Sequence, residues 1–445
     1  MTRYLGAAGY GHYRIILAVL TLATVVAELG TSSIIAREFA RPGADQERVL
    51  GNALGLRLVT VTIGVALAGA MAALLPFELN VALGVLVGGF GFVAMSLNAV
   101  LFVLFQQRLR QSGPVLAEAA GVLMLLALAW TLTLTRTGNG EIAFVVATAA
   151  SSVLTVAISA IFATRLLRIR LLFEWAEWRR LLVPALPIAV TALLTLVYYR
   201  LDIVILGIVR PGTEVGLYGV PAKILDAIVG FTLLFTGLLM PLMARQVGGD
   251  VARFRQFFDL GTNTLAIGTG AALLVILLHA ESIVTLIGGA DFAAGGPALR
   301  VLGVMAMVVS IRFMAQQAAT ALDAQRRLVR GYVAAAIVGV AAYGTLIPHY
   351  GALGAALGLL AGETVVLVWI LIVLRSHTLY LSAGVPLKVL ASIGVSYLAW
   401  TRLEQHELPW AISALLAIVV YFLLLLAMRG LPRDVLHLMT LAKRA

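Results

Sequence analysis

The sequence places a few charged residues inside long apolar runs, where charges are rare. The run YYRLDIVILG, residues 198–207, holds Arg200 and Asp202. Arginine and lysine bind phosphate and carboxylate groups, while a buried acid can carry a proton or a sodium ion. The candidates for such chemistry are Glu28, Arg200, Asp202, Lys223, Asp226, Arg312 and Glu363. Together they indicate a site that binds an anionic group and can be coupled to an ion.

The elements that must position these charges are membrane-spanning helices. The chain has 445 residues, of which 61% are hydrophobic and 12% charged, and soluble domains are only about 45–50% apolar. Apolar runs long enough to cross about 30 Å of hydrocarbon fall near 12–35, 51–75, 79–105, 114–135, 142–164, 183–209, 214–244, 256–279, 297–322, 328–347, 351–374, 385–401 and 409–428. The sequence therefore predicts an all-α, polytopic membrane protein with about thirteen transmembrane helices.

The connections between these runs alternate between arginine-rich and nearly bare. By the positive-inside rule the arginine-rich set is cytoplasmic, which places the C-terminus inside and the N-terminus, as given, outside. The most basic connection, RLLRIRLLFEWAEWRR (residues 165–180), is expected to form an interfacial helix on the cytoplasmic leaflet.

Several classes of site are not expected. The chain has no cysteine, and its six histidines are scattered without an i,i+4 pair, so neither a metal site nor another cofactor is predicted. The net charge of +11 is spread over short loops, which indicates membrane topology rather than nucleic-acid binding.

The deep charges differ in what could compensate them. Arg200 and Asp202 are two residues apart and lie on different sides of a helix, whereas Lys223 and Asp226, three apart, can pair. We expect Arg200, Lys223 and Arg312 to face a cavity and bind substrate. For Asp202 and Asp226 a structural alternative stays open, in which a Lys223–Asp226 pair is joined by an Arg200–Asp226 or Lys223–Asp202 bridge.

Glu28 and Glu363 are interpreted as lone acids deep in helices. Each could carry a coupling proton or sodium ion, or be a hydrogen-bonded packing residue. Five other charges lie within about two helical turns of a helix end, from which they can reach the interface, and are expected to be mostly structural. They are Arg14, Arg57, Glu118, Arg300 and Asp323.

The chain also contains an internal repeat. LGAAGYGHYRIILAVL (5–20) aligns with LGIVRPGTEVGLYGVPAKIL (206–225), and each copy leads into a helix that ends at an Ala-Arg pair. Such repeats are typical of transporters built from two related bundles. The second copy follows the helix 183–205 and the first follows only Met1 to Tyr4, so we expect the chain to begin one helix late. The alternative is a duplication in which no helix was lost.

Several stretches resemble a known family. TRYLGAAGYGHY, ELGTSSIIAREFA, LPIAVTALLTLVYYRLDIVILGIVRPGTEVGLYGVPAKIL, LLMPLMAR and LIPHYGALGAALG are similar to the polysaccharide or oligosaccharide flippases (Wzx-type) of the MOP superfamily, relatives of MATE exporters and lipid II flippases. The resemblance implies two pseudo-symmetric six-helix lobes around a central cavity and two additional C-terminal helices. The expected domains are an N-terminal lobe lacking its first helix (1–164), a cytoplasmic interfacial linker (165–182), a C-terminal lobe (183–374), and the extra helix pair with a cytoplasmic tail (375–445).

The resemblance also implies a function. The family moves undecaprenyl-diphosphate-linked sugar units across the bacterial cell membrane, so the expected partners are this lipid-linked oligosaccharide, membrane lipids and the polysaccharide polymerase machinery. A cation-coupled small-molecule exporter of the MATE type is the first alternative. A membrane glycosyltransferase or polymerase would need a large outer loop with catalytic carboxylates, and the outer connections here are short, so no enzymatic activity is expected.

Overall fold

The computed structural model describes residues 1–28, 30–39, 41, 43–108, 110–135, 140–403 and 409–430. Every regular element in these ranges is a helix. The chain divides into two compact units, Met1–Gly216 and Leu217–Ala445.

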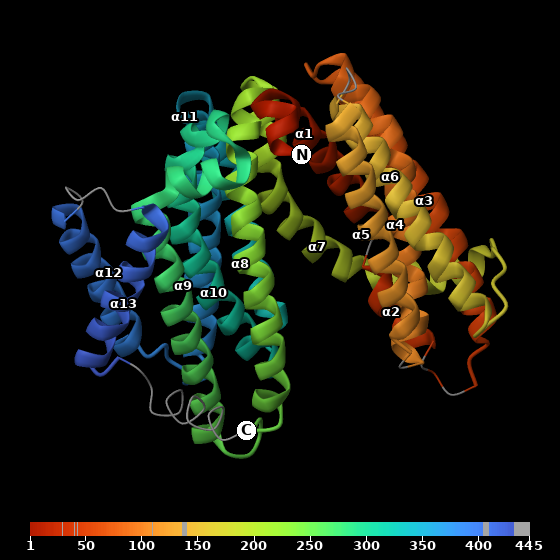
Figure 1. The fold of residues 1–445 in the computed structure, drawn as a ribbon. Helices are drawn as coiled ribbons and strands as arrows, with labels where there is room; N and C mark the ends of the chain where they lie inside the picture. Colours follow the sequence, from red (N-terminus) through yellow and green to blue (C-terminus); the bar gives the residue numbers. More distant parts are fainter. Residues whose placement is uncertain are drawn as a thin grey trace. The chain divides into compact units, whose positions relative to one another are not determined.

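The first unit is a bundle around a central α4 (Figure 1). Its helices are α1 (Thr2–Glu28), α2 (Thr31–Phe39), α3 (Gln46–Leu74), α4 (Leu79–Gln107), α5 (Ser112–Thr135), α6 (Gly140–Thr164) and α7 (Trp175–Val209). Helix α4 packs against α1, α3 and α6, while α5 packs mainly on α6. Small residues permit the closest contact, because a Cβ on Gly91 of α4 would lie 2.6 Å from Cα of Ala149 on α6.

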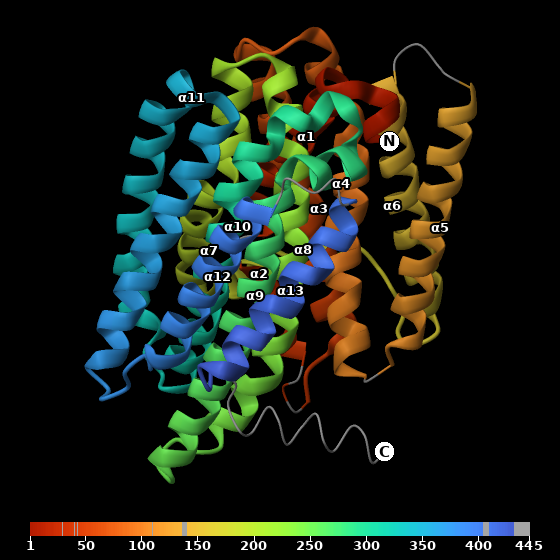
Figure 2. The same cartoon turned by 60° about the vertical axis from the view of Figure 1, so that its left-hand side comes forward.

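The second unit contains most of α8 (Gly212–Ala244), then α9 (Val251–Gly288), the 3-10 helix η1 (Ala290–Gly295), α10 (Gly296–Ala321), α11 (Gln325–Arg375), α12 (Gly384–Leu403) and α13 (Trp410–Ala427). Helix α10 packs against α9 and α11. The pair α12 and α13 lies against α9 (Figure 2). Tyr421 of α13 donates a hydrogen bond to the Ile267 carbonyl at 2.9 Å, and Ser413 Oγ lies 2.9 Å from Nε2 of His279.

The fold-class prediction is confirmed, with differences in how helices are divided. Ten helices in the described ranges are long and apolar enough to cross a membrane. Helix α11 bends at Gly351, whose φ of +53° favours glycine, and so accounts for two predicted runs. Helices α7 and α12 account for two more. The predicted run 12–35 is two helices instead of one, because Gly30 adopts a φ of +65° between α1 and α2. The lobe boundaries at 164, 183 and 374 stay predictions.

The predicted interfacial helix over 165–180 is wrong for most of its length, since helix α7 begins only at Trp175 and residues 168–174 are irregular. These residues lie against α3, where the Leu172 N–H donates to the Gly51 carbonyl at 3.1 Å. A Cβ on Gly55 would lie only 2.1 Å from the Leu172 carbonyl oxygen, so this contact requires glycine. Backbone groups that an interfacial helix would pair internally are thus used to hold the segment on α3.

The start of α7 is fixed by charged side chains. The N–H of Glu174 donates to Oδ1 of Asn52 at 2.9 Å, and its carboxylate accepts from Arg48 Nε at 3.0 Å. The carboxylate also accepts a hydrogen bond from Asn52 Nδ2 at 3.3 Å. The side-chain hydrogen bonds to the carboxylate, first that of Arg48 and then that of Asn52, hold the pKa of the Glu174 carboxyl below its usual value. Arg180 Nη2 donates to the buried Glu38 carboxylate of α2 at 2.7 Å. The N-terminal turns of α7 are therefore tied to α2 and α3 within the first unit.

Candidate functional site

Arg200 and Asp202 lie on α7, in the first unit. Asp202 is buried, and its Oδ1 accepts the N–H of Ile203 at 2.7 Å. Arg200 is half-buried, and both charges make further interactions. Because the two residues are two positions apart on a helix, they face different ways and cannot pair with each other. Each therefore interacts with other groups, and neither is an isolated charge.

Lys223 and Asp226 lie on α8, in the second unit. Lys223 is exposed and Asp226 is half-buried. The structure gives no ion pair between these two described residues, so nothing supports the alternative in which Lys223 and Asp226 pair, and Asp226 makes another interaction. The positive charge of Lys223 thus stays accessible to a ligand instead of being neutralised from within its own helix.

Two predicted residues come together in a buried ion pair. Arg312 of α10 and Glu363 of α11 are 4% and 0% exposed, and Nε and Oε2 are 2.6 Å apart, as an ion pair rather than an aligned hydrogen bond. Arg312 Nη1 also donates to Gln316 Oε1 at 2.6 Å, and Tyr332 OH donates to the same oxygen at 2.8 Å. The interpretation of Glu363 as a lone acid is wrong, because the neighbouring helix supplies its counter-charge.

Glu28 is also not the deep, lone acid that its position in an apolar run suggested. It is the last residue of α1, is exposed, and accepts a hydrogen bond from Ser32 Oγ at 2.9 Å. Arg57, expected at the interface, is 3% exposed and donates to Thr31 Oγ1 at 3.0 Å and to Ser32 Oγ at 3.1 Å. The break at Gly30 explains both corrections, because it brings the end of α1 and the hydroxyls of α2 next to Arg57.

Sequence reasoning missed Arg14. The residue lies on α1 and was expected to reach the interface, yet it is only 7% exposed. Its Nε and Nη2 are buried and have no hydrogen-bond partner among the described residues, and no ion pair with Arg14 occurs there either. Helix α1 packs against α3, α4, α6 and α7, so the distance to a helix end does not decide its exposure. One signal was present in the sequence: no acid stands three or four residues from Arg14.

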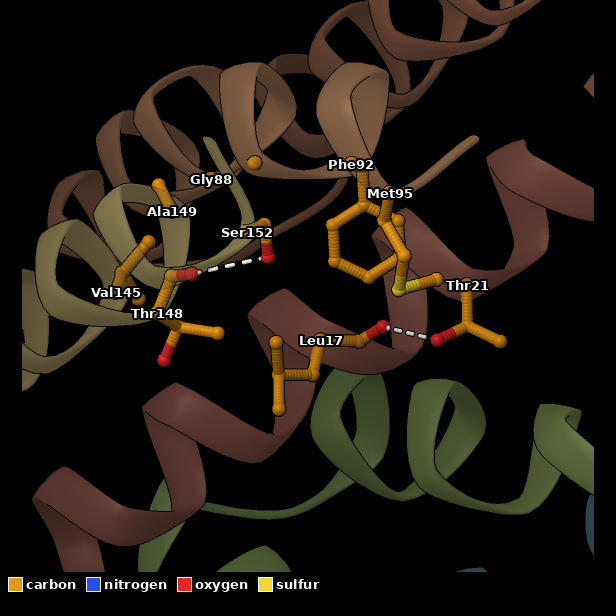
Figure 3. Close-up of a pocket in the computed structure, with 10 residues that line it drawn as sticks. Leu17, Thr21, Gly88, Phe92, Met95, Val145, Thr148, Ala149 and Ser152 are labelled. Carbon is orange, nitrogen blue, oxygen red and sulfur yellow. Dashed lines mark hydrogen bonds between the residues drawn. The ribbon is translucent and has the colours of Figure 1, made fainter. Parts of the chain in front are cut away.

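The first unit also contains a pocket between α1, α4 and α6 (Figure 3). Its volume is about 270 Å³. Leu17 and Thr21, at three and seven residues from Arg14, line it from the same face of α1. Phe92 and Met95 of α4 close one side. No charged side chain is among the described residues that line it, so a search of the sequence for charges could not have found it.

Three hydroxyl groups form the polar part of this pocket. Thr21 Oγ1 donates to the Leu17 carbonyl at 2.7 Å, and Ser152 Oγ donates to the Thr148 carbonyl at 3.0 Å (Figure 3). Thr148 Oγ1 donates to the carbonyl one turn earlier at 2.8 Å and lies 3.2 Å from the hydroxyl of Tyr13. The pocket thus combines apolar walls with neutral polar groups, and Arg14 precedes Leu17 by three residues on α1.

Comparison with known proteins gives the family. A family model described as polysaccharide biosynthesis protein matches residues 1–247, which is more than half of the chain. The chain belongs to this family. No curated protein matches it in sequence. The resemblance to the flippases of the MOP superfamily is thereby confirmed at the level of family.

Solved structures of MOP-superfamily proteins share the fold of this polysaccharide biosynthesis protein. The lipid II flippase MurJ, in an inward closed conformation, matches with a TM-score of 0.80 at 12% identity, over 95% of this chain and 93% of that one. An inward-facing multidrug resistance MATE family transporter matches with a TM-score of 0.62 at 15% identity, over 85% of this chain and 95% of that one. A MOP superfamily transporter from Pyrococcus furiosus gives 0.57 at 16% identity, over 84% and 89%. At these identities the likeness establishes the fold, that of a multi-pass membrane transporter.

Proposed function

We propose that the protein flips undecaprenyl-diphosphate-linked oligosaccharide units across the bacterial cytoplasmic membrane by alternating access, for surface polysaccharide synthesis. Membership of the polysaccharide biosynthesis family and a fold shared with a lipid II flippase support this proposal. The observation that carries it is the buried, uncompensated guanidinium of Arg14. A polysaccharide polymerase would take over the flipped unit on the outer side, and the protein itself would catalyse no covalent step.

Arg14 suits a diphosphate because it lacks a counter-charge. A cation at the centre of a transmembrane helix costs on the order of 3 kcal/mol unless something compensates it. A diphosphate supplies negative charge and acceptor oxygens in the geometry that a guanidinium binds in a bidentate manner. In the absence of an acidic partner among the described residues, an anionic ligand is the natural complement of this side chain.

The residues chosen from the sequence keep proposed roles beside Arg14. Lys223, which is exposed, and Arg200 are proposed to contact the substrate as it passes. Arg312 is proposed to do so only when released from Glu363. The proposed ion-coupling acids are Asp202, Asp226 and Glu363. In this proposal the C-terminus is cytoplasmic and the N-terminus, as given, is outside.

Replacing Arg14 tests the proposal. In a bacterial strain lacking its own flippase, Arg14→Gln should lower surface polysaccharide at least tenfold, the effect of about 1.4 kcal/mol, and the lipid-linked intermediate should accumulate. Arg14→Lys should retain part of the activity, since it keeps the charge but loses the planar fork. The exposed Arg3 on the same helix provides the matched control Arg3→Gln.

The stability of the same variant separates ligand binding from a structural role. Removing a charge that has no partner among the described residues should leave the melting temperature of purified Arg14→Gln unchanged or raised. A lowered melting temperature would assign the lost activity to misfolding, and wild-type polysaccharide levels in Arg14→Gln would refute the proposed function of this residue.

The second candidate function is cation-coupled export of small molecules. The fold similarity to multidrug MATE transporters and the buried Asp202 favour it. An exporter of cations should use acids in its binding site, and the uncompensated charge on α1 is instead basic. Resistance of expressing cells to cationic dyes, unaltered by Arg14→Gln, would favour the exporter.

A further inference from the structure

We infer that the pocket between α1, α4 and α6 binds a sugar ring of the transported unit, close to the diphosphate. This inference rests on the proposed function and adds a site that recognises the sugar. The pocket lies wholly within the first unit, and its volume is about 270 Å³. A cavity of this size has room for one sugar ring.

The charge of the pocket argues against an ionic occupant. The described residues that line it are neutral, so a phosphate or a carboxylate would lose its hydration without gaining a counter-charge. A quaternary or primary ammonium would be equally uncompensated, because the pocket offers no carboxylate. A neutral, polyhydroxylated ring carries no charge, so it needs no counter-charge from the pocket.

The hydroxyl groups of the pocket select for a ligand that donates hydrogen bonds. A serine or threonine hydroxyl carries one proton and two lone pairs. Thr21, Thr148 and Ser152 each donate that proton to a carbonyl of their own helix. Because Thr148 donates to a carbonyl, the Tyr13 hydroxyl donates to Thr148 Oγ1 and uses one of its lone pairs. The oxygens of Ser152 and Thr148 therefore offer their remaining lone pairs to a ligand and no donor. Sugar hydroxyls can donate to such acceptors, whereas fully ionised phosphate oxygens cannot.

The apolar walls complement the other face of a sugar. A pyranose ring carries hydroxyls at its edge and C–H groups on its faces, and it needs an apolar surface beside its polar contacts. Leu17 and Val145 supply aliphatic surface, and Phe92 supplies an aromatic ring opposite the hydroxyls of α6 (Figure 3). Pockets that combine apolar walls with a few oriented polar groups are typical small-molecule sites.

The spacing along α1 connects this site to Arg14. Leu17 and Thr21 are three and seven residues beyond Arg14, or about 4.5 and 10.5 Å along the helix axis. A sugar joined directly to a diphosphate at Arg14 would fall within this interval. The pocket is therefore placed to recognise a sugar next to the carrier lipid, and the remaining sugars would extend beyond it.

Binding measurements on the full protein in nanodiscs test the inference. The probes are a short-chain prenyl diphosphate without sugar and the same diphosphate carrying N-acetylglucosamine, glucose or galactose. Wild-type protein should bind at least one sugar-bearing probe more tightly than the bare one. The double variant T148V/S152A should lower the ratio of the two affinities, sugar-bearing over bare, by about three- to tenfold, which is the effect of one to two hydrogen bonds. Binding of the bare probe should not weaken.

The chain offers a matched control on the same helix. Thr155 is also part-buried, and its hydroxyl donates to the carbonyl four residues earlier, at 3.0 Å, but it does not line the pocket. Thr155→Val should keep the full sugar preference, which separates ligand contact from any effect on α6. Arg14→Gln should weaken bare and sugar-bearing probes by the same factor.

Each outcome separates the two proposals. If the bare diphosphate binds but none of the three sugars adds affinity, or if T148V/S152A keeps the preference, the sugar site is refuted and the proposed flippase function stands. If neither kind of probe binds, the proposed function itself fails. If T148V/S152A abolishes binding of a cationic dye instead, the pocket belongs to an exporter and the sugar site is refuted.

Discussion

The buried pair Arg312–Glu363 allows one prediction to be developed in detail. Both side chains are almost fully buried, and the closest nitrogen and oxygen are 2.6 Å apart. Removing one partner of such a pair leaves the other charge uncompensated in an apolar interior, which costs about 3–5 kcal/mol. For a unit of this size, each kcal/mol lowers the melting temperature by about 2–4 °C. Arg312→Met and Glu363→Leu should therefore each lower it by about 6 °C or more.

The double variant R312M/E363L should recover most of that loss. It removes both charges together and replaces them with apolar side chains of similar volume, which is often neutral or stabilising for a buried pair. Thermal unfolding of the four purified proteins gives a double-mutant cycle. A double variant that unfolds at the sum of the two single losses would refute the idea that the pair is coupled.

The same cycle tests the proposed substrate role of Arg312. If Arg312 only holds α10 against α11, the stable double variant should restore surface polysaccharide in the flippase-deficient strain. If Arg312 also contacts the diphosphate, the double variant should be stable yet inactive. The melting temperature thus reports on the packing role of Arg312, and surface polysaccharide reports on its proposed contact with the diphosphate.

Two further predictions concern the ties between helices. Because the pKa of Glu174 is lowered by its hydrogen bonds from Arg48 and Asn52, its stabilising contribution is present above the unfolded pKa of about 4.3 and is lost as the pH falls through the lowered value. The melting temperature of wild type should exceed that of Glu174→Gln at neutral pH, and this difference should vanish in strong acid. A difference that does not change with pH would contradict a stabilising role for the hydrogen bonds between the Glu174 carboxylate and α3. Tyr421→Phe removes the 2.9 Å hydrogen bond to the Ile267 carbonyl and should cost about 1 kcal/mol in thermal unfolding, whereas an unchanged value would mean that apolar packing alone holds α13 to α9.

The helices could be predicted because the signal for each is local. An apolar run of about twenty residues specifies a transmembrane helix without reference to any other part of the chain. Helix breaks were less predictable. The bend at Gly351 coincides with the boundary predicted between the runs 328–347 and 351–374, whereas the break at Gly30, which also adopts a positive φ, falls inside the predicted run 12–35 and was missed. The irregular segment before α7 was also missed, because its partners, Gly51 and Asn52, are more than a hundred residues earlier.

The state of each charge could not be predicted, because it depends on neighbours distant in sequence. Glu363 looked solitary in its own helix, and its counter-charge comes from α10. Arg14 looked peripheral, and contacts of α1 with four other helices bury it. The pocket of the first unit has no sequence signature at all, since neutral residues from three helices create it. The types and depths of the charges predict an anionic substrate, and this stays a prediction. Which arginine lacks a counter-charge could be read only from the fold.

Charge compensation therefore distinguishes Arg14 from Arg312. Arg14 has no counter-charge among the described residues and can attract an anion as it stands, whereas Arg312 must first be released from Glu363. Protonation of Glu363 would remove the negative charge and free the guanidinium. The proposed substrate role of Arg312 and the proposed ion-coupling role of Glu363 are thus linked: the diphosphate would engage the second unit only together with a proton. Under that linkage Glu363→Gln, which is permanently neutral, should bind the bare prenyl diphosphate at least as tightly as wild type, and its affinity should lose the pH dependence that wild type shows.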